Sequence, residues 1–504
     1  MTTRYGCVLM GLWAGAGCVS GDAPATEITQ QAVSLTDRLG ACATDPRVVA
    51  GAVSADICAG ADVFLREDFG GNGRTCATCH RVDNNFTIDP AFISRLPAND
   101  PLFVAEFNPD LAGLEIPAQM RSKGLILENV DGTDPDPRTH FVLRSVPHNF
   151  SMGTSVTRAA GDPVTAIVER TGWSGDGAPG SGSLRDFLSG AINQHYTRSL
   201  ARTPGTDFRP ADDGELDRVE LYMRQLGRTN ELDLASVVMS DAGAELGRTT
   251  FLAVGCNACH GNAGANASFG GGGNRNFNTG VESSRSADLA AFPHDGGFLR
   301  APANPDGSFG DGTFNTPPLI EAVDTGPFFH TATTIAGAPA HNTAMASTIE
   351  EAIAFYSSPA FNSSPAGKAR QIALTPTQID DIGRFLRGLN ASFNAALAVK
   401  RLDASAAMVN RFGNGSMAIQ REELRLVNVE IRDAVRVLLS VPNLDLVSVA
   451  ELTAAAALVE TGRITDVPLA RQLAIGVARS LVVDASGKIG SNLTFQIGAG
   501  TVMF

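Results

Sequence analysis

Two cysteine pairs, each followed directly by a histidine, are the residues of this chain best suited to chemistry. The first stretch is Cys76-Ala77-Thr78-Cys79-His80 and the second is Cys256-Asn257-Ala258-Cys259-His260. In the pattern C-x-x-C-H, two thiols can add to the two vinyl groups of one porphyrin, and the histidine can become the proximal ligand of its iron. Eight Cys and eight His placed at random in 504 residues would give on the order of 0.002 such pentapeptides. The repeated motif predicts two covalently bound c-type haems, with His80 and His260 as proximal ligands.

Two other kinds of cysteine site fit these stretches less well. A thioredoxin-type C-x-x-C requires a strand-to-helix setting and no histidine. A zinc site would need a fourth ligand within range, usually in a compact small module. The formal net charge of −14 argues against a nucleic-acid partner, because nucleic-acid binders normally carry a basic face.

The N-terminus has the pattern of an export signal. Arg4 precedes an apolar run over residues 8–16 that is too short to span a bilayer. The run ends at Gly17-Cys18, as in a bacterial lipoprotein processing site, and ordinary cleavage near residues 14–16 is the alternative. We therefore expect residues 1–18 to be an export signal and residues 19–40 a tether. The mature protein would be periplasmic, anchored to the outer membrane through a lipidated Cys18, or secreted.

Cys42 and Cys58 remain once the signal and the two haem motifs have taken the other cysteines. They lie sixteen residues apart in a chain that is expected to be exported to an oxidising compartment. We expect a disulfide between them, worth about 3 kcal/mol on the loop-entropy estimate. Two unpaired buried thiols are the alternative.

Helices are expected on both sides of each motif. An apolar helix over 61–67 leads into a glycine-rich loop and the first motif, and residues 244–252 lead into the second. Asp212 and Asp213 begin a closing helix in the first half, and Thr375-Pro376-Thr377-Gln378 forms a capping box at the start of the second closing helix. This order is that of a cytochrome c module, and it predicts a mainly α fold.

Three regions follow from this pattern. Residues 41–232 and 233–400 would each form a cytochrome c-like haem domain, and residues 401–504 a helical appendage without His or Cys. Each domain carries a long irregular insertion rich in Pro, Gly, Asn and Asp, at 81–160 and at 261–348. Loops of this length inside a compact protein are usually functional.

Beyond the two motifs, the chain resembles the bacterial di-haem cytochrome c peroxidase superfamily, which includes MauG. The resemblance is carried by the stretches 144–149, 172–177, 184–187, 314–319, 326–330 and 347–356. Within that superfamily the chain looks most like the rubber oxygenase branch, because of its long first insertion and the run at 274–280. The resemblance implies an active N-terminal haem, an electron-transfer C-terminal haem and, by family likeness alone, a calcium ion.

The resemblance also implies roles for single residues. Trp173 matches a tryptophan between the haems that can relay electrons, and core packing is the alternative for a large aromatic side chain. Tyr356 matches the position of a distal ligand on the C-terminal haem. His341 or Met345 are alternatives for that iron. His140 and His148 are candidate distal ligands of the first haem, and surface or propionate-bonding histidines are the alternative.

One departure from the family concerns acid–base chemistry. Peroxidases of this family carry an active-site Glu where this chain has residues 191–197, a segment without a carboxylate. His195 would be the substitute, or the reaction would start from dioxygen, and Thr197 would occupy the place of the Glu. Because a missing acid–base group typically costs about 10²- to 10⁴-fold in rate, we expect weak turnover with peroxide.

The most probable function from sequence is a haem-dependent oxidoreductase that activates dioxygen or peroxide at the N-terminal haem, with electrons relayed from the C-terminal haem. A non-catalytic di-haem electron-transfer lipoprotein and an ordinary cytochrome c peroxidase are the alternatives. A redox partner protein or a small oxidant would be the partner, and the organic substrate is unknown.

Overall fold

The protein is described here by a computed structural model, which covers residues 33–129, 141–160, 168–175, 182–267, 272–285, 287–298, 310–330 and 346–503. These residues belong to one compact unit that begins at Val33. Helices dominate it, and the strands of the described residues pair only as three short antiparallel ribbons, so the expected mainly α fold is confirmed. The predictions for the export signal and for Cys18 lie outside the described residues.

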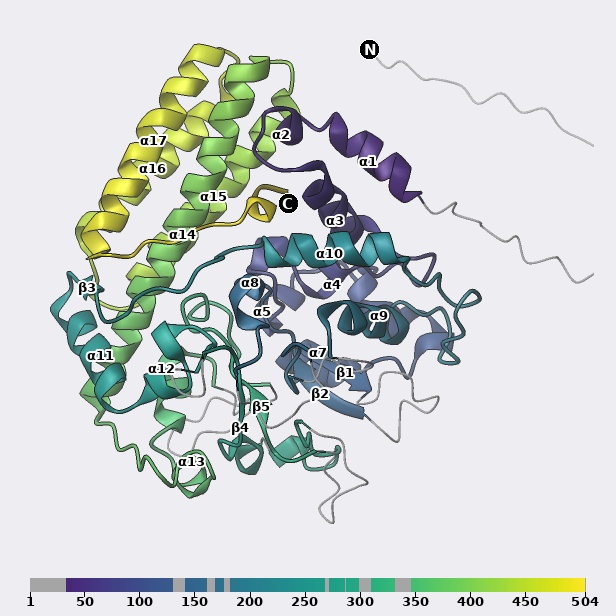
Figure 1. Ribbon diagram of the computed structural model, residues 1–504, viewed down its shortest axis with the longest axis vertical. Helices are drawn as coiled ribbons and strands as arrows, with labels where there is room; N and C mark the ends of the chain where they lie inside the picture. The colour runs from purple at the N-terminus through teal and green to yellow at the C-terminus, as the bar shows by residue number, and fades with distance from the viewer. Residues whose placement is uncertain are drawn as a thin grey trace, which may run out of the picture. The chain divides into compact units, whose positions relative to one another are not determined.

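The helices of the first half pack around the first motif (Figure 1). In chain order they are α1 (Leu35–Ala43), α2 (Pro46–Val49), α3 (Ala55–Arg66), α4 (Cys76–Cys79), α5 (Pro90–Ile93), α6 (Val104–Phe107), α7 (Pro117–Lys123), α8 (Met152–Ser155), α9 (Leu184–His195) and α10 (Asp213–Arg224). Helix α1 begins inside the expected tether and runs beyond its end at residue 40, because the Ser34 hydroxyl accepts a hydrogen bond from the amide of Asp37 and caps the helix there. Residues 35–40 are therefore helical.

The second half contains longer helices and the remaining ribbons. The helices are α11 (Ala242–Ala253), α12 (Ile349–Phe355), α13 (Pro359–Ser363), α14 (Pro376–Phe412), α15 (Met417–Leu439), α16 (Leu446–Ile464) and α17 (Pro468–Ile489). The ribbons pair β1 (Leu125–Asn129) with β2 (Phe141–Ser145), β3 (Val238–Met239) with β6 (Gly490–Ser491), and β4 (Asn276–Phe277) with β5 (Phe314–Asn315).

The same helix pair occurs beside each motif. Helix α3 packs against α10, and α11 packs against α14. A Cβ atom at Gly60 in α3 would lie 1.9 Å from the carbonyl oxygen of Arg218, and one at Gly247 in α11 would lie 1.9 Å from that of Asp381. Only glycine permits backbones to approach so closely. The two halves therefore repeat one arrangement, in which a glycine-containing helix crosses the closing helix ahead of its motif.

Both closing helices begin as the sequence predicts. Asp212 and Glu215 form a reciprocal capping box at α10, and Thr375 and Gln378 form another at α14. Helix α14 then continues for 37 residues and passes through residue 400 without a break. Helix α14 therefore crosses the predicted boundary at 400 and belongs both to the second half and to the C-terminal region.

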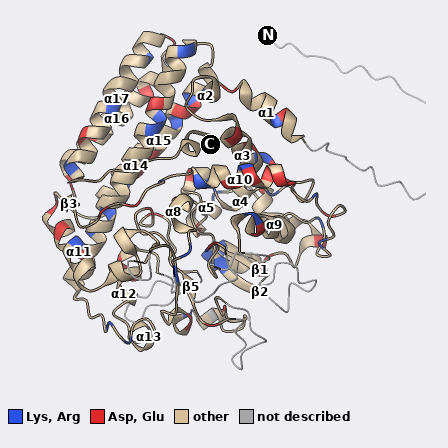
Figure 2. Ribbon diagram, viewed as in Figure 1, with Lys and Arg blue, Asp and Glu red and all other residues tan. Residues whose placement is uncertain are grey.

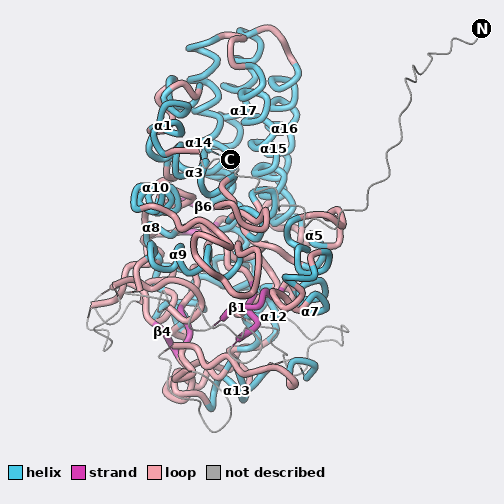
Figure 3. The backbone as a smooth tube through the Cα atoms, turned by 90° about the vertical axis from the view of Figure 1, so that its right-hand side faces the viewer, coloured by secondary structure: helices cyan, strands magenta, loops and turns pink. Residues whose placement is uncertain are grey.

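Helices α14 to α17 form a four-helix bundle in which each helix packs against two others. Figure 3 shows this bundle extending away from the loops around the motifs, and Figure 2 shows that most of α16 and α17 is uncharged. No helix among the described residues is long and apolar enough to cross a membrane. The insertion at 81–160 is less irregular than expected, because it holds α5 to α8 and the β1–β2 hairpin.

Candidate functional site

Both C-x-x-C-H motifs line one cavity. Its volume is about 380 Å³, and most of its lining is apolar. The lining includes Cys76, Cys79 and His80 from the first motif and Cys256, Cys259 and His260 from the second. The fold thus places the two predicted haem-attachment stretches on a shared space.

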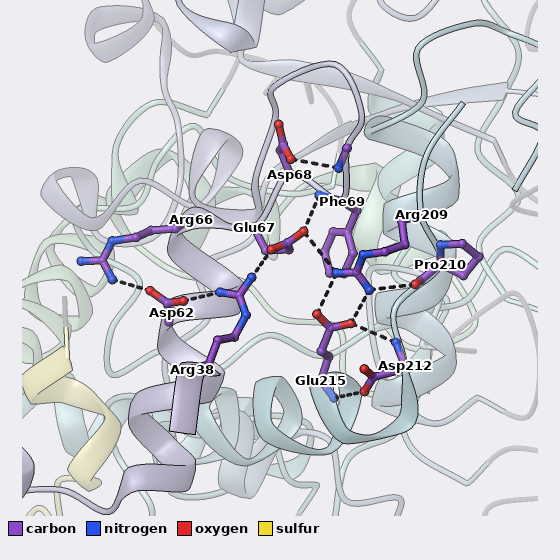
Figure 4. Close-up of polar contacts among 11 residues, drawn as sticks. Arg38, Asp62, Arg66, Glu67, Asp68, Phe69, Arg209, Pro210, Asp212 and Glu215 are labelled. Carbon is purple, nitrogen blue, oxygen red and sulfur yellow. Dashed lines mark hydrogen bonds and ion pairs between the residues drawn. The ribbon is translucent and has the colours of Figure 1, made fainter. Parts of the chain in front are cut away.

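An ion-pair network fixes the chain just ahead of the first motif (Figure 4). The Glu67 carboxylate, which is buried, pairs with Arg38 from α1 and, at 3.1 Å, with Arg209. Arg209 also pairs with Glu215 in α10 at 2.8 Å, and its amide donates to the carbonyl of Phe69. These contacts tie the loop that leads to Cys76 to the helices on both sides of it.

The two histidines are held in the same way. Nδ1 of His80 lies 3.0 Å from the carbonyl oxygen of Phe86, and Nδ1 of His260 lies 3.0 Å from that of Pro317. A ring that donates through Nδ1–H keeps Nε2 unprotonated and available to a metal. Burial lowers the pKa of His80 to about 4 and that of His260 to about 4. Both rings are therefore neutral near pH 7, as ligation requires.

The motif cysteines are protonated thiols. Burial raises the pKa of Cys76 and of Cys79 to about 11, and that of Cys256 to about 12. The Tyr196 hydroxyl donates to the Cys76 sulfur at 3.1 Å. Such thiols lack the low pKa of a disulfide-exchange centre. Two half-buried thiols and one neutral histidine from each motif, all lining an apolar cavity, are the donor set that a covalently attached porphyrin needs.

Cys42 and Cys58 stand apart from the cavity. They form a disulfide that joins α1 to α3, with their Cα atoms 5.8 Å apart. This is the pair that the sequence analysis expects. Among the described residues, no group of three or more His, Cys, Asp or Glu side chains converges as a metal site does.

Trp173 lines the cavity and is held at both its backbone and its ring. Its indole N–H donates to the carbonyl of Ser145 at 2.8 Å, and its own carbonyl accepts from the amide of Asn315 at 2.8 Å. The ring of His330 lies 6.2 Å from the indole, and Nε2 of His330 lies 2.7 Å from Glu282. The indole is thus fixed at the wall of a cavity that both motifs share.

His195 lines the cavity, whereas Thr197 does not. Burial lowers the pKa of His195 to about 3, and its Nδ1 atom has no hydrogen-bond partner. The Thr197 side chain is buried elsewhere, where its hydroxyl donates to the carbonyl of Ser199 at 2.5 Å. Thr197 is therefore not among the residues that line the cavity, because its side chain turns toward the loop that follows α9.

A carboxylate that the sequence analysis missed does line the cavity. Glu128 reaches it from β1, and Arg144 of β2 holds one of its oxygens at 3.0 Å. Arg144 also pairs with Asp295 at 2.6 Å. The signal lies in the sequence itself, since Glu128 is the only charged residue in the strand Leu125–Asn129. Its position gives no hint of this role, because the Glu of the peroxidase family falls in the segment after α9.

The candidate distal ligands are only partly described. Tyr356, at the C-terminal end of α12, lines the cavity, and burial raises the pKa of its phenol. His148 lines it too, and its buried Nδ1 atom has no hydrogen-bond partner. His140, His341 and Met345 lie outside the described residues. Tyr356 and His148 therefore remain candidates on geometric grounds.

Comparison of the chain with models of protein families, with curated proteins and with solved structures found no match. The function is therefore argued from the residues of the cavity.

Proposed function

We propose that the protein is a di-haem c-type oxidoreductase that uses dioxygen or peroxide as its oxidant. The observation that carries this proposal is the single cavity lined by both C-x-x-C-H motifs. Cys76 and Cys79 would hold one porphyrin through thioether bonds, and Cys256 and Cys259 the other. When bound, the haems supply the one-electron and oxygen chemistry, and the protein supplies position and electrostatics.

The residues around the cavity support a division of labour between the two ends. Beside the first motif, His80 is the proximal ligand. His195 and Glu128 are the lining side chains that could accept or donate a proton there. Ile126 and Val146, on the hairpin that carries Glu128, pack with Cys79 in one apolar cluster. At the second end, His260 is the proximal ligand and Tyr356 the candidate second ligand. The first end would therefore meet the oxidant and the second would store electrons.

Trp173 is the residue that would connect the two ends. An indole can be oxidised and reduced, and its hydrogen bond to Ser145 fixes its plane. The calcium ion that the resemblance implies has no role in this proposal.

Haem content and oxidant turnover test the proposal together. The protein should be produced in a bacterium that attaches c-type haem, and its mass should exceed that of the bare chain by two haems. The double variant Cys76→Ala/Cys79→Ala should carry one haem and lose turnover with both oxidants. The double variant Cys256→Ala/Cys259→Ala should also carry one haem.

The matched control is Cys42→Ala/Cys58→Ala, which removes two cysteines outside the cavity and should keep both haems. A wild-type protein without covalent haem would refute the proposed cofactor. Turnover that survives loss of the first haem would place the oxidant at the wrong end. Two haems that bind no carbon monoxide in the ferrous state would leave a non-catalytic electron carrier.

A further inference from the structure

The outer face of the α16–α17 pair carries exposed apolar residues and no unpaired charge. We define the hairpin face by the exposed residues Leu446, Val447, Ala450, Thr453, Ala454, Ala457, Thr461 and Ile464 of α16, and Leu469, Ala470, Leu473, Gly476, Val477, Ser480 and Val483 of α17. None of the exposed residues of α16 is charged. Leu469 is 70% exposed and Leu473 is 62% exposed.

The bundle core does not account for these residues. Helix α16 already buries Leu452, Ala455 and Val459, and α17 buries Ala478 and Val482, on the sides that face the other helices. A helix at the surface of a soluble protein normally pairs one apolar stripe with a charged opposite face. Here the opposite face is apolar as well, and contiguous exposed apolar surface of this kind marks an interaction site.

Helix α17 also exposes two charged residues, Arg479 and Asp484, and Asp484 lies on the same side of the helix as Ser480 because four residues separate them. The charges on and beside the hairpin face neutralise one another. Lys488 pairs with Glu451 and with Asp484, Arg463 pairs with Glu460 at 2.6 Å, and Arg479 pairs with Asp403 at 2.5 Å. Figure 2 shows how little blue or red ribbon these two helices carry. A helix that lies on a lipid surface normally carries Lys and Arg along its polar side and aromatic residues on its apolar side. The hairpin face has no aromatic residue and no cation free to meet a lipid head group.

A second copy of this chain fits the face better. Two copies that each carry a net charge of −14 repel one another most where acidic surfaces meet. Contact through a face without net charge adds the least to that repulsion. The small residues Ala450, Ala454, Ala457 and Gly476 allow helices to approach closely. Leu469 and Leu473 offer the larger side chains that fill such a contact.

We propose that the protein forms a two-fold symmetric dimer through the hairpin face. Nineteen residues of α16 at about 1.5 Å rise give a face roughly 28 Å long, and two helices about 10 Å across make it roughly 20 Å wide. The flat area of this face is on the order of 600 Å², without the extra surface that side chains add. That area is close to the ~800 Å² that each partner buries in a standard interface. No residue of α16 or α17 lines the cavity that holds the two motifs, so the dimer leaves that site free.

The substitution Leu473→Glu tests the proposal in the full-length haem-loaded protein. The side chain is mostly exposed, so the fold should persist, with unchanged circular dichroism and melting temperature. In a two-fold interface each partner contributes one introduced carboxylate, so two charges are buried. The dissociation constant of the dimer should therefore rise by at least about 100-fold. The matched control is Leu246→Glu on α11, where the side chain is 59% exposed and outside the hairpin face.

Light scattering and sedimentation over a wide concentration range give the readout. The wild type and Leu246→Glu should have twice the mass of one chain, and Leu473→Glu the mass of one. Ala457→Cys should give a cross-linked dimer that Leu473→Glu abolishes. A wild type that is monomeric at every concentration overturns the proposal, as does a dimer that Leu473→Glu leaves intact. A monomer that floats with phosphatidylglycerol vesicles would overturn it and assign the face to lipid.

Discussion

Glu321 is the carboxylate on which the buried guanidinium of Arg228 depends. Both side chains are fully buried, and Nε of Arg228 lies 2.9 Å from Oε1 of Glu321. The hydroxyl of Ser151 donates to the same oxygen. Arg228 and Ser151 lie in the first half and Glu321 in the second. The contact thus joins both halves beside the cavity.

Glu321→Gln keeps the shape of the side chain and removes its charge. Breaking a buried ion pair by removing one partner typically costs about 3–5 kcal/mol, because the other charge stays buried. Glu231 still lies 3.1 Å from Nη1 of Arg228 and is about one-quarter exposed, so part of the compensation survives. We therefore expect a loss of about 3 kcal/mol, at the lower end of that range.

The stability lost in Glu321→Gln should depend on pH in a direction that the pKa of Glu321 defines. Burial raises the pKa of Glu321, but Arg228 and His148 outweigh burial and hold the pKa below its ordinary value. A carboxyl group whose folded-state pKa is lowered stabilises the fold above its unfolded pKa of about 4.3 and loses that effect as the pH falls through the folded-state pKa. The gap between wild type and Glu321→Gln should therefore be full at pH 7 and shrink in acid.

Urea unfolding at pH 7 and in acid measures both effects. The control is Glu422→Gln, because Glu422 and Arg425 form an exposed pair at 2.8 Å that should be worth no more than about 1 kcal/mol. The double variant Arg228→Met/Glu321→Leu should be less destabilised than Glu321→Gln alone, since neither charge is left buried. If Glu321→Gln and Glu422→Gln had the same unfolding midpoint, the dependence of Arg228 on Glu321 would be refuted.

Two further predictions concern stability. Replacing Cys42 and Cys58 with Ala should lower the free energy of unfolding by about 3 kcal/mol, because a sixteen-residue separation is closed by the disulfide; an unchanged urea midpoint would contradict this. Burial, and then Asp433, raise the pKa of Asp324 well above its ordinary value, so the stability linked to its proton is fully present below the unfolded pKa of about 3.9 and is lost as the pH rises through the raised value. Asp324→Asn should flatten this fall in melting temperature with rising pH, and parallel curves for variant and wild type would count against the explanation.

Local signals in the sequence predicted local structure well. The capping boxes at Asp212 and Thr375 depend on residues three positions apart, and both form. The C-x-x-C-H stretches are equally local, and each folds into a short helical turn. The predicted boundary at residue 400 had no such local signal, and α14 runs across it. No Pro or Gly occurs between Leu389 and Phe412, so the helix continues.

Contacts between distant segments could not be predicted in the same way. The carbonyl groups that hold His80 and His260 belong to Phe86 and Pro317. The first lies six residues from its histidine, but the second lies in a loop that reaches His260 only through the packing of the second half. A backbone carbonyl is present at every residue, so no side-chain pattern marks the one that will orient a ring.

The position of Glu128 shows how a contact between distant segments can add a carboxylate to the cavity. The expectation of weak peroxide turnover assumed that the reaction site had no carboxylate, because none occurs at 191–197. The β1–β2 pairing places Glu128 opposite Val142 and beside Arg144, and this pairing delivers the carboxylate to the cavity from a segment more than fifty residues earlier in the chain. Acid–base catalysis requires reach and protonation state, and sequence position decides neither. Glu128 is therefore a carboxylate within the cavity of the proposed reaction, and on that proposal we expect peroxide to serve as an oxidant beside dioxygen.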